Sequence, residues 1–443
     1  MKQLEFTAIK GRKLTASFEE ERISSDFGSI LLGEVEQSIG IIDKIVSCIN
    51  DKRASTRIRH TLHQILKQRC LQICCGYEDG NDSNFLRNDP AFMISSGKAP
   101  DDSFGLASQP TMCRLENSIN KTDNLRIFYA LIDIYLDSFE VKPKFIQLDM
   151  DPTDNICHGM QQLSLFNGYY EERCYLPFHV YDGTDGRLIS TFLRAGKTPT
   201  GKEIVSVLSR IVKRIRQRWD DIPIIFRADT HHSSKTVLQY LEGENVQYII
   251  GKSSSEPLKK LFNFAYKQAL LKYKKFGKPI KVYASSYYTA KGWNDKSRRI
   301  ICCIEVNSHK IKYRFIITSF EEASAKYLYE TAYCGRGRAE LMIKDHKNAL
   351  KSDRSSCSSA VANQFRLYIH SAAYVIMHNL RKTVLRGTDL EKAQFDTIRL
   401  KILKLAVRVK VMKTKIHCFL QKDYKYANVY SDICNVYTAM NSS

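Results

Sequence analysis

Acidic residues follow two apolar segments of this chain in a pattern that suits metal binding. In "FIQLDMDPT", Asp149 and Asp151 stand two residues apart, so in a strand they point to the same face of the sheet. In "IIFRADT", Asp229 follows a second apolar run. Acids at the carboxyl ends of neighbouring strands of an α/β sheet are placed to hold Mg²⁺ or Mn²⁺ together. An Asp at a strand end also caps turns in proteins without any site, so each acid alone is a weak signal.

A third group of polar residues lies in "YCGRGRAELMIKDHK", residues 333–347, where Glu340 stands among cations. In an α-helix, at about 100° per residue, one stripe of this stretch holds Tyr333, Arg336, Glu340, Lys344 and Lys347. On such a stripe Glu340 can bind a metal ion while the cations and the Tyr hydroxyl contact phosphates. A solvated helix with Glu–Lys pairs four residues apart has the same pattern, so this stretch alone leaves both interpretations open.

The elements that must position these residues begin near residue 140. Apolar runs predict strands in residues 142–153, 173–183 and 186–196, then a helix, a strand, a helix and a strand. The last four elements are expected in residues 201–221, 222–230, 233–245 and 246–251. This order predicts an α/β fold with a hairpin at the front of its sheet. Residues 280–319 alternate as antiparallel strands do, and 325–350 and 358–386 are typical of helices.

The sequence divides into three expected regions around this core. Residues 1–140 are expected to form a mainly helical region for DNA binding or dimer contacts, and 141–386 the catalytic domain, with a β insertion at about 270–325. Residues 387–443 form a basic C-terminal region in which Val407, Val409 and Val411 alternate with cations, as in a strand with one basic face. A helix predicted in residues 55–76 has a basic face that could follow a DNA backbone or be merely solvated. Its members are Arg57, Arg59, His60, Lys67 and Arg69.

The composition favours a polyanionic partner. The chain has 68 Lys and Arg against 47 Asp and Glu, a formal net charge of +21. Such a chain binds DNA or RNA readily because each neutralised phosphate releases counterions. The 13 cysteines form no C-x-x-C pair and no Cys/His cluster at zinc spacing, which argues against a disulfide framework and a zinc module.

No targeting or membrane segment is recognisable. The first 30 residues lack the features of a signal peptide. No run of about 18 apolar residues exists that would cross a membrane. We therefore expect a cytoplasmic protein without membrane contacts.

The acid-bearing stretches resemble those of one protein family. Tyr333, Arg336, Glu340 and Lys347 match every spacing of the Tyr-Arg-Glu-Lys signature of bacterial DDE transposases in the superfamily around insertion sequence 4. Other stretches look like the insertion sequence 1380 family, and together they span roughly residues 75–420. They include "GYEDGND", "LRNDPAF", "ASQPTMCRLEN", "LDMDPT", "HGMQQ", "FNGYY" and "FRADT".

This resemblance implies an RNase H-like core and a metal-dependent DNA transposase. It implies two Mg²⁺ or Mn²⁺ ions on Asp151, Asp229 and Glu340, with Asp149 as the alternative first acid. The side chains it assigns to DNA are Tyr333, Arg336, Lys344 and Lys347. It further implies cleavage at terminal inverted repeats, cut-and-paste transfer into target DNA, a homodimer in the synaptic complex, and a cytoplasmic protein associated with the nucleoid.

The sequence departs from the family pattern after the second acid. The family usually reads R-A-D-S-G-F there, whereas this chain has Arg227-Ala228-Asp229-Thr230-His231-His232. The glycine is lost and two histidines enter the neighbourhood of Asp229. The alternative function is therefore a catalytically impaired or domesticated transposase that acts only by binding DNA.

Overall fold

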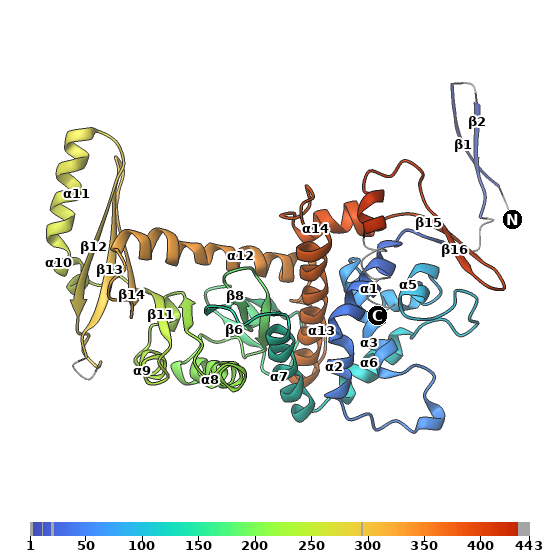
Figure 1. Cartoon of the computed structure of the whole chain (residues 1–443), viewed down its shortest axis with the longest axis horizontal. Helices are drawn as coiled ribbons and strands as arrows, with labels where there is room; N and C mark the ends of the chain where they lie inside the picture. The colour runs from blue at the N-terminus through green and yellow to red at the C-terminus, as the bar shows by residue number, and fades with distance from the viewer. Residues whose placement is uncertain (1–2, 11, 19–21, 294–295, 433–443) are drawn as a thin grey trace.

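The computed structural model describes residues 3–10, 12–18, 22–293 and 296–432. Its parts lie in a row (Figure 1): a β insertion with a long helix at one end, the main sheet in the middle, and a helical region around α13 (Ala360–Asn379) at the other end. The fold is mixed α/β, as the sequence predicts.

One sheet of eight strands runs through the middle and the insertion. Across the sheet the strands are β12 (Ile280–Tyr288), β13 (Arg298–Val306), β14 (Ile311–Thr318), β11 (Gln247–Lys252), β10 (Ile224–Ala228), β4 (Ile146–Pro152), β8 (Phe178–Asp182) and β9 (Leu188–Phe192). β4, β10 and β11 are parallel, and all other neighbours are antiparallel. The carboxyl ends of β4 and β10 therefore lie at the same edge.

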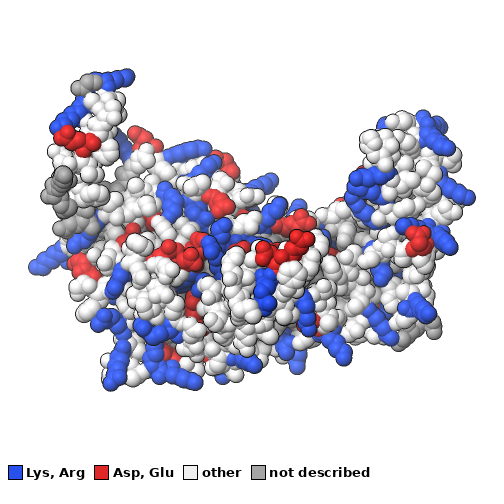
Figure 2. Space-filling model, turned by 180° about the vertical axis from the view of Figure 1, so that it is seen from behind, with Lys and Arg blue, Asp and Glu red and all other residues white. Residues whose placement is uncertain are grey.

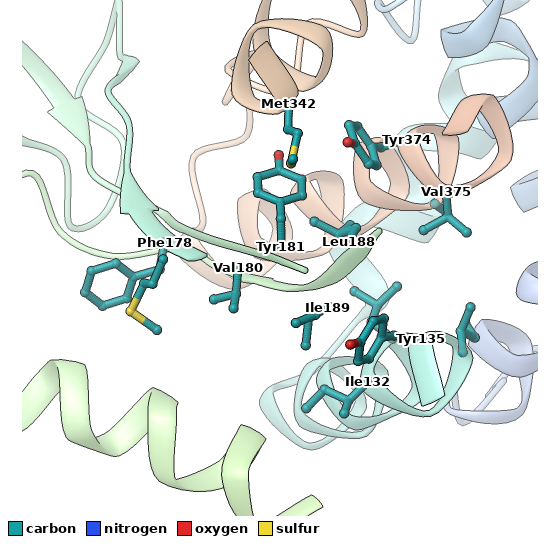
Figure 3. Close-up of a cluster of buried hydrophobic side chains, with 14 of the residues drawn as sticks. Ile132, Tyr135, Phe178, Val180, Tyr181, Leu188, Ile189, Met342, Tyr374 and Val375 are labelled. Carbon is teal, nitrogen blue, oxygen red and sulfur yellow. The ribbon is translucent and has the colours of Figure 1, made fainter. Parts of the chain in front are cut away.

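Helices cover both faces of this sheet. In the chain α8 (Gly201–Arg218) lies between β9 and β10, and α9 (Lys235–Gly243) connects the parallel strands β10 and β11. α8 starts at a capping box in which Thr200 and Glu203 satisfy each other's backbone N–H groups. Its apolar residues Ile204, Leu208 and Ile211, at helical spacing, are buried. At β8 and β9, α7 (Lys121–Asp137) packs on one face while α12 (Gly337–Lys344) and α13 pack on the other (Figure 3).

The helical segment around α12 is not one regular α-helix. The backbone winds widely as a π-helix over η3 (Tyr327–Tyr333), tightens to a 3₁₀ turn in η4 (Cys334–Arg336), forms α12, and widens again in η5 (Asp345–Ala349). A constant 100° per residue therefore does not hold between residues 333 and 347. The predicted single stripe of side chains assumes one regular α-helix, and that geometry holds only over α12, which carries Glu340 and Lys344.

The second predicted strand, 173–183, is interrupted. Leu176 and Pro177 separate β7 (Glu172–Tyr175) from β8, and β7 pairs with β5 (Asn155–Ile156) and β6 (Leu165–Asn167) in a small separate sheet. Pro177 has no N–H to donate to a ladder, so the run divides between two sheets.

The N-terminal region is mainly helical but begins with a hairpin that the sequence did not predict. The hairpin is β1 (Leu4–Ile9) with β2 (Arg12–Ala16), and β3 (Ile23–Ser24) then joins two C-terminal strands. The other elements before α7 are α1 (Gly28–Ile39), α2 (Ile41–Ser47), η1 (Ser55–Arg57), α3 (Leu62–Cys74), α4 (Asp82–Leu86), α5 (Pro90–Ser95) and α6 (Gln109–Ser118). The remaining helices of the core and insertion are the short η2 (Thr230–His232) and α10 (Glu256–Leu261) and the long α11 (Asn263–Phe276).

The described C-terminal elements pack against the N-terminal helices. They are η6 (Leu380–Val384), α14 (Phe395–Ile398), η7 (Arg399–Leu403), β15 (Val407–Val411) and β16 (Ile416–Phe419). Val407 and Val409 are buried while Arg408 and Lys410 are exposed, as the alternation predicts.

The largest hydrophobic cluster runs from Leu31 to Val429 through α13 and the main sheet. The division at residues 140 and 386 stays a prediction, because the helices before residue 140 share this core with the rest of the chain. Within the residues that the structure describes, no helix has the length and apolar character needed to cross a membrane.

Candidate active site

Two of the predicted acids lie side by side at the edge of the sheet. Ala228 of β10 pairs with Met150 of β4 in parallel register. Asp151 and Asp229 are the next residues on the two strands, so they are neighbours at the carboxyl ends. Both side chains are largely buried, with 17% and 22% of their surface exposed. The sheet therefore brings together two of the three acids.

Asp149 forms a buried ion pair with Arg227. Arg227, its cross-strand partner on β10, donates from Nε to Asp149 Oδ1 at 2.7 Å and from Nη2 to Oδ2 at 2.5 Å. The Arg227 side chain also donates to the carbonyl of Ala332 at 2.6 Å. Burial raises the pKa of Asp149, against the lowering effect of Arg227. This chain of contacts ties β4, β10 and η3 together.

Asp151 accepts a hydrogen bond from the helical segment above it. Arg336 Nη1 donates to Asp151 Oδ2 at 2.6 Å. Burial raises the pKa of Asp151 to about 6, with a further contribution from Asp229, while Arg336 acts in the opposite direction. The raised pKa means that the negative charge of Asp151 is not fully stabilised by its surroundings. A further cation beside Asp151 would therefore be favourable.

Asp229 is held by the two histidines that distinguish this sequence. His231 Nδ1 and His232 Nδ1 lie 2.8 Å from Asp229 Oδ2 and Oδ1, and the His231 N–H donates to Oδ1 at 3.1 Å. Burial alone would raise the pKa of Asp229, but the bonds to His232 and His231 outweigh it and hold this pKa well below its usual range. His232 is fully buried and His231 is exposed, so the Thr-His-His turn shapes the surroundings of Asp229.

Glu340 lies on α12 with its side chain exposed. The link between Glu340 and the two Asp residues is Arg336, one turn earlier. Burial would lower the pKa of the Arg336 guanidinium, but the charges of Asp151, Asp229 and Glu340 act against burial and help raise it. All three predicted acids therefore act electrostatically on one cation.

The other residues of the expected stripe face different surroundings. Tyr333 is half-buried against β11, where a Cβ on Gly251 would lie 2.6 Å from its hydroxyl oxygen. Lys347 Nζ bonds Asp154 Oδ1 at 2.8 Å, and Lys344 is exposed. Lys347 therefore joins the segment to the loop after β4, while Lys344 points to solvent.

A buried polar cluster beneath the acids was not predicted. His179 is the β8 partner of Asp151, and its ring stands 4.8 Å from that of His346 on η5. The Tyr181 hydroxyl lies 3.0 Å from His346 Nδ1, and burial lowers the pKa of both histidines. Sequence spacing carries no signal for this cluster, because residues 179 and 346 meet only in the folded chain.

The Glu340 helix is also anchored by apolar packing. Met342 is buried against Tyr181 and Tyr374 (Figure 3). One turn of chain further on, Asp345 accepts from Arg381 at 2.6 Å. These contacts fix where α12 stands relative to β4 and β8.

We expect the packing of Met342 to contribute to the free energy of unfolding. Met342→Ala should lower the free energy of unfolding by about 2–3 kcal/mol, because it removes a buried side chain and leaves a cavity. Leu341, its neighbour in sequence, is 52% exposed, so Leu341→Ala should change that free energy by no more than about 0.5 kcal/mol. Denaturant unfolding of both variants measures the difference. Equal losses would show that α12 is not packed on the sheet through Met342.

Carboxylate oxygens are the ligands that Mg²⁺ and Mn²⁺ prefer, so the donors of Asp151, Asp229 and Glu340 fit such an ion chemically. Among the described residues, however, no three His, Cys, Asp or Glu side chains lie close enough together to hold a metal ion. In this structure Arg336 supplies a positive charge next to Asp151.

The charge distribution on the surface and the similarity to known protein families both concern the substrate of these acids. In the view from behind (Figure 2), Lys and Arg spread over the whole face and acids gather in a band near its middle. The family model described as "Transposase DDE domain group 1" matches residues 6–441. No curated protein matches the chain.

Proposed function

The chain belongs to the family of DDE-domain transposases, and we propose that it is the transposase of a bacterial insertion sequence. It cleaves DNA at terminal inverted repeats and joins the ends to target DNA by a cut-and-paste route. The observation that supports this most directly is the charge arrangement at the strand ends. Asp151 and Asp229 are neighbours, and Arg336, one turn before Glu340, donates to Asp151 at 2.6 Å.

We assign the first acid to Asp151 rather than Asp149, because both oxygens of Asp149 are already bonded to Arg227. Asp151, Asp229 and Glu340 would hold two Mg²⁺ or Mn²⁺ ions, which supply Lewis acidity to activate water or a DNA 3′-hydroxyl and to stabilise the leaving oxygen. Asp149 instead serves to hold Arg227 and through it the helical segment.

Four side chains of this segment are proposed to bind DNA. Arg336 bonds Asp151 of the site and Lys347 bonds the nearby Asp154, and a DNA phosphate offers both cations negative charge and acceptor oxygens. Tyr333 positions the transposon end, and the exposed Lys344 reaches phosphates further out.

The fold is proposed to be RNase H-like. β4, β8 and β9 are three antiparallel strands, followed by α8, β10, α9 and β11, which is the order that this core requires. The strands β12–β14 then form the insertion, at about residues 270–325, and helices α10 and α11 precede these strands in the chain. The "HGMQQ" and "FNGYY" stretches support membership of the insertion sequence 1380 family.

The proposed partners are the terminal repeats and target DNA, met by a homodimer in the synaptic complex. The mainly helical region before residue 140 and the basic tail are proposed to contribute to repeat binding and dimer contacts. This activity takes place in the cytoplasm, on the nucleoid. A net charge of +21 supports a polyanionic partner.

One observation favours a second function: His231 and His232 each form a hydrogen bond with Asp229. Both Asp229 oxygens have partners that a metal ion would have to share or displace. In that case the protein is an impaired or domesticated transposase that binds DNA without cutting it.

Metal removal separates the two functions. Purified protein, incubated in Mg²⁺ with a plasmid that carries its own gene and flanking DNA, should release the element as a linear fragment. An excess of EDTA should abolish release, because the carboxylates then lack the cations, while gel-shift binding of the same DNA persists. Binding without cleavage in Mg²⁺ and in Mn²⁺ would support the DNA-binding alternative, and cleavage in EDTA would contradict the metal mechanism.

A further inference from the structure

A cavity of about 630 Å³ lies beside β9, the outermost strand of the main sheet at the end away from the β insertion. Residues of α7, α8 and α13 line it together with the end of β9, and α7 packs against the other three elements (Figure 1). Among the described residues of its lining, none is a proposed metal ligand or DNA-binding side chain. Its volume falls in the range of small-molecule sites, about 300–1,000 Å³.

The walls of this cavity are mainly apolar. Its buried wall residues include Phe128, Val207 and Tyr368. Three further apolar side chains of the lining are exposed to solvent, Leu125 by 44%, Leu163 by 58% and Phe192 by 38%. Exposed apolar side chains that gather around one hollow mark binding sites. A ligand with an apolar body would remove these surfaces from water.

The backbone holds Leu163 at this cavity in a conformation that leucine rarely adopts. Its φ is +68°, in the left-handed region. The neighbouring Gln162 is fixed on both sides, because its N–H donates to the Ser358 carbonyl at 2.9 Å and its carbonyl accepts from the Tyr175 hydroxyl at 2.6 Å. Strained backbone persists only where the surrounding structure holds it, and it is concentrated at ligand sites and other functional positions.

The cavity carries positive charge without an acid. Its described lining has three cations, Lys121, Arg194 and Arg210, and no Asp or Glu. Arg194 pairs with Glu203 at 3.4 Å, but within the described part of the chain neither Lys121 nor Arg210 forms an ion pair. Arg210 bonds the Ser206 hydroxyl oxygen at 2.7 Å. An apolar hollow with two unneutralised cations attracts an anion.

A buried donor in the lining favours the same ligand chemistry. Gln364 of α13 is 8% exposed, and its Oε1 accepts the N–H of Leu193 at 2.7 Å. Its Nε2 has no acceptor among the residues that the structure describes. A buried N–H without an acceptor is unfavourable, so an anionic oxygen bound beside Gln364 would be stabilised.

We propose that this cavity binds a small amphiphilic anion, a carboxylate on an apolar chain. The apolar walls enclose the chain, and Lys121, Arg210 and Gln364 donate to the carboxylate oxygens. Duplex DNA fits poorly, because its outer surface is a charged backbone and has no apolar body to fill the walls. The proposal does not depend on the proposed function, since no side chain of the candidate active site takes part in it.

The test compares decanoate with decanol, which has the same chain without the charge, by isothermal titration calorimetry. Lys121→Gln/Arg210→Gln, the cavity variant, removes both unpaired cations of the lining. Lys202→Gln/Lys213→Gln, the control, removes two exposed cations of α8 that do not line the cavity. The wild-type protein should bind decanoate more tightly than decanol. The cavity variant should bind decanoate about tenfold more weakly or worse, because charge-assisted bonds are lost, and decanol as before.

The control should bind both ligands like the wild type, and thermal melts show whether each variant is folded. Leu125→Gln tests the apolar wall separately and should weaken both ligands about fivefold, so the site stays testable even with a cavity variant that does not fold. Absence of decanoate binding by the wild type, or wild-type affinity in the folded variants of the lining, would overturn the site. Equal affinity of the wild type for decanoate and decanol would overturn the anionic ligand class.

Sedimentation velocity examines the competing occupant, a second copy of the chain. A dimer that the cavity variant loses, together with absence of decanoate binding, would show that a second copy covers this cavity and would overturn the proposal. DNA cleavage by the wild type is measured separately in Mg²⁺. A protein that binds decanoate but does not cleave DNA would keep this site and lose the proposed function, and the reverse result would keep the function alone.

Discussion

Glu340→Gln is expected to abolish DNA cleavage and strand transfer while DNA binding persists. The substitution keeps the size of the side chain but removes the charge that holds a metal ion. We expect the rate to fall by about 10³-fold or more, which corresponds to about 4 kcal/mol of transition-state stabilisation. Release of the element from a plasmid in Mg²⁺ measures cleavage, and gel shift measures binding.

The control for this variant lies on the same helix. Arg338 is exposed like Glu340 but has no role in the proposed site, so Arg338→Gln should cleave at a rate close to that of the wild type. Joining of transposon ends to target DNA by the Glu340→Gln protein in Mg²⁺ would remove Glu340 from the site. Loss of folding is not expected, because the side chain is exposed and its replacement leaves the core intact.

Asp149→Asn is expected to destabilise the fold more than any substitution of the three proposed metal ligands. Asp149 and Arg227 are 1% and 4% exposed, so removal of the negative charge leaves a buried guanidinium uncompensated. Breaking a buried pair in this way costs about 3–5 kcal/mol of unfolding free energy. Urea unfolding followed by circular dichroism measures the loss.

Asp151→Asn provides the matched comparison, two residues along the same strand. Its pKa is raised by burial to about 6, so a neutral side chain is tolerated there, and we expect a stability change within about 1 kcal/mol. The assignment of the two acids would be reversed by an Asp149→Asn protein that folds like the wild type but cannot cleave, together with an Asp151→Asn protein that still cleaves.

Local sequence patterns were sufficient to predict α8, β10 and β11. α8 has an apolar stripe at helical spacing and a capping box at Thr200 and Glu203, so both its position and its buried face follow from the sequence. β10 and β11 are short apolar runs between helices, which is typical of buried parallel strands. The N-terminal hairpin was missed, because β1 and all but one residue of β2 are exposed and carry no pattern set by burial.

The candidate site could be predicted only in part. The spacing placed Asp151 and Asp229 at strand ends, and parallel pairing makes them neighbours. That Asp149, and not Asp151, has both oxygens bonded to Arg227 was not predictable, since this depends on the cross-strand contact between β4 and β10. The orientation of Lys347 was also unpredictable, because it follows from the wide turns around α12 and the contact with Asp154.

The most direct test of the central claim is the anomalous scattering of Mn²⁺ in crystals of the protein with its terminal-repeat DNA. We predict Mn²⁺ peaks about 2.2 Å from carboxylate oxygens of Asp151, Asp229 and Glu340, with Arg336 released from Asp151. Mn²⁺ bound at Asp149, or bound at the two strand-end acids with Glu340 remaining in solvent, would contradict the three-carboxylate site.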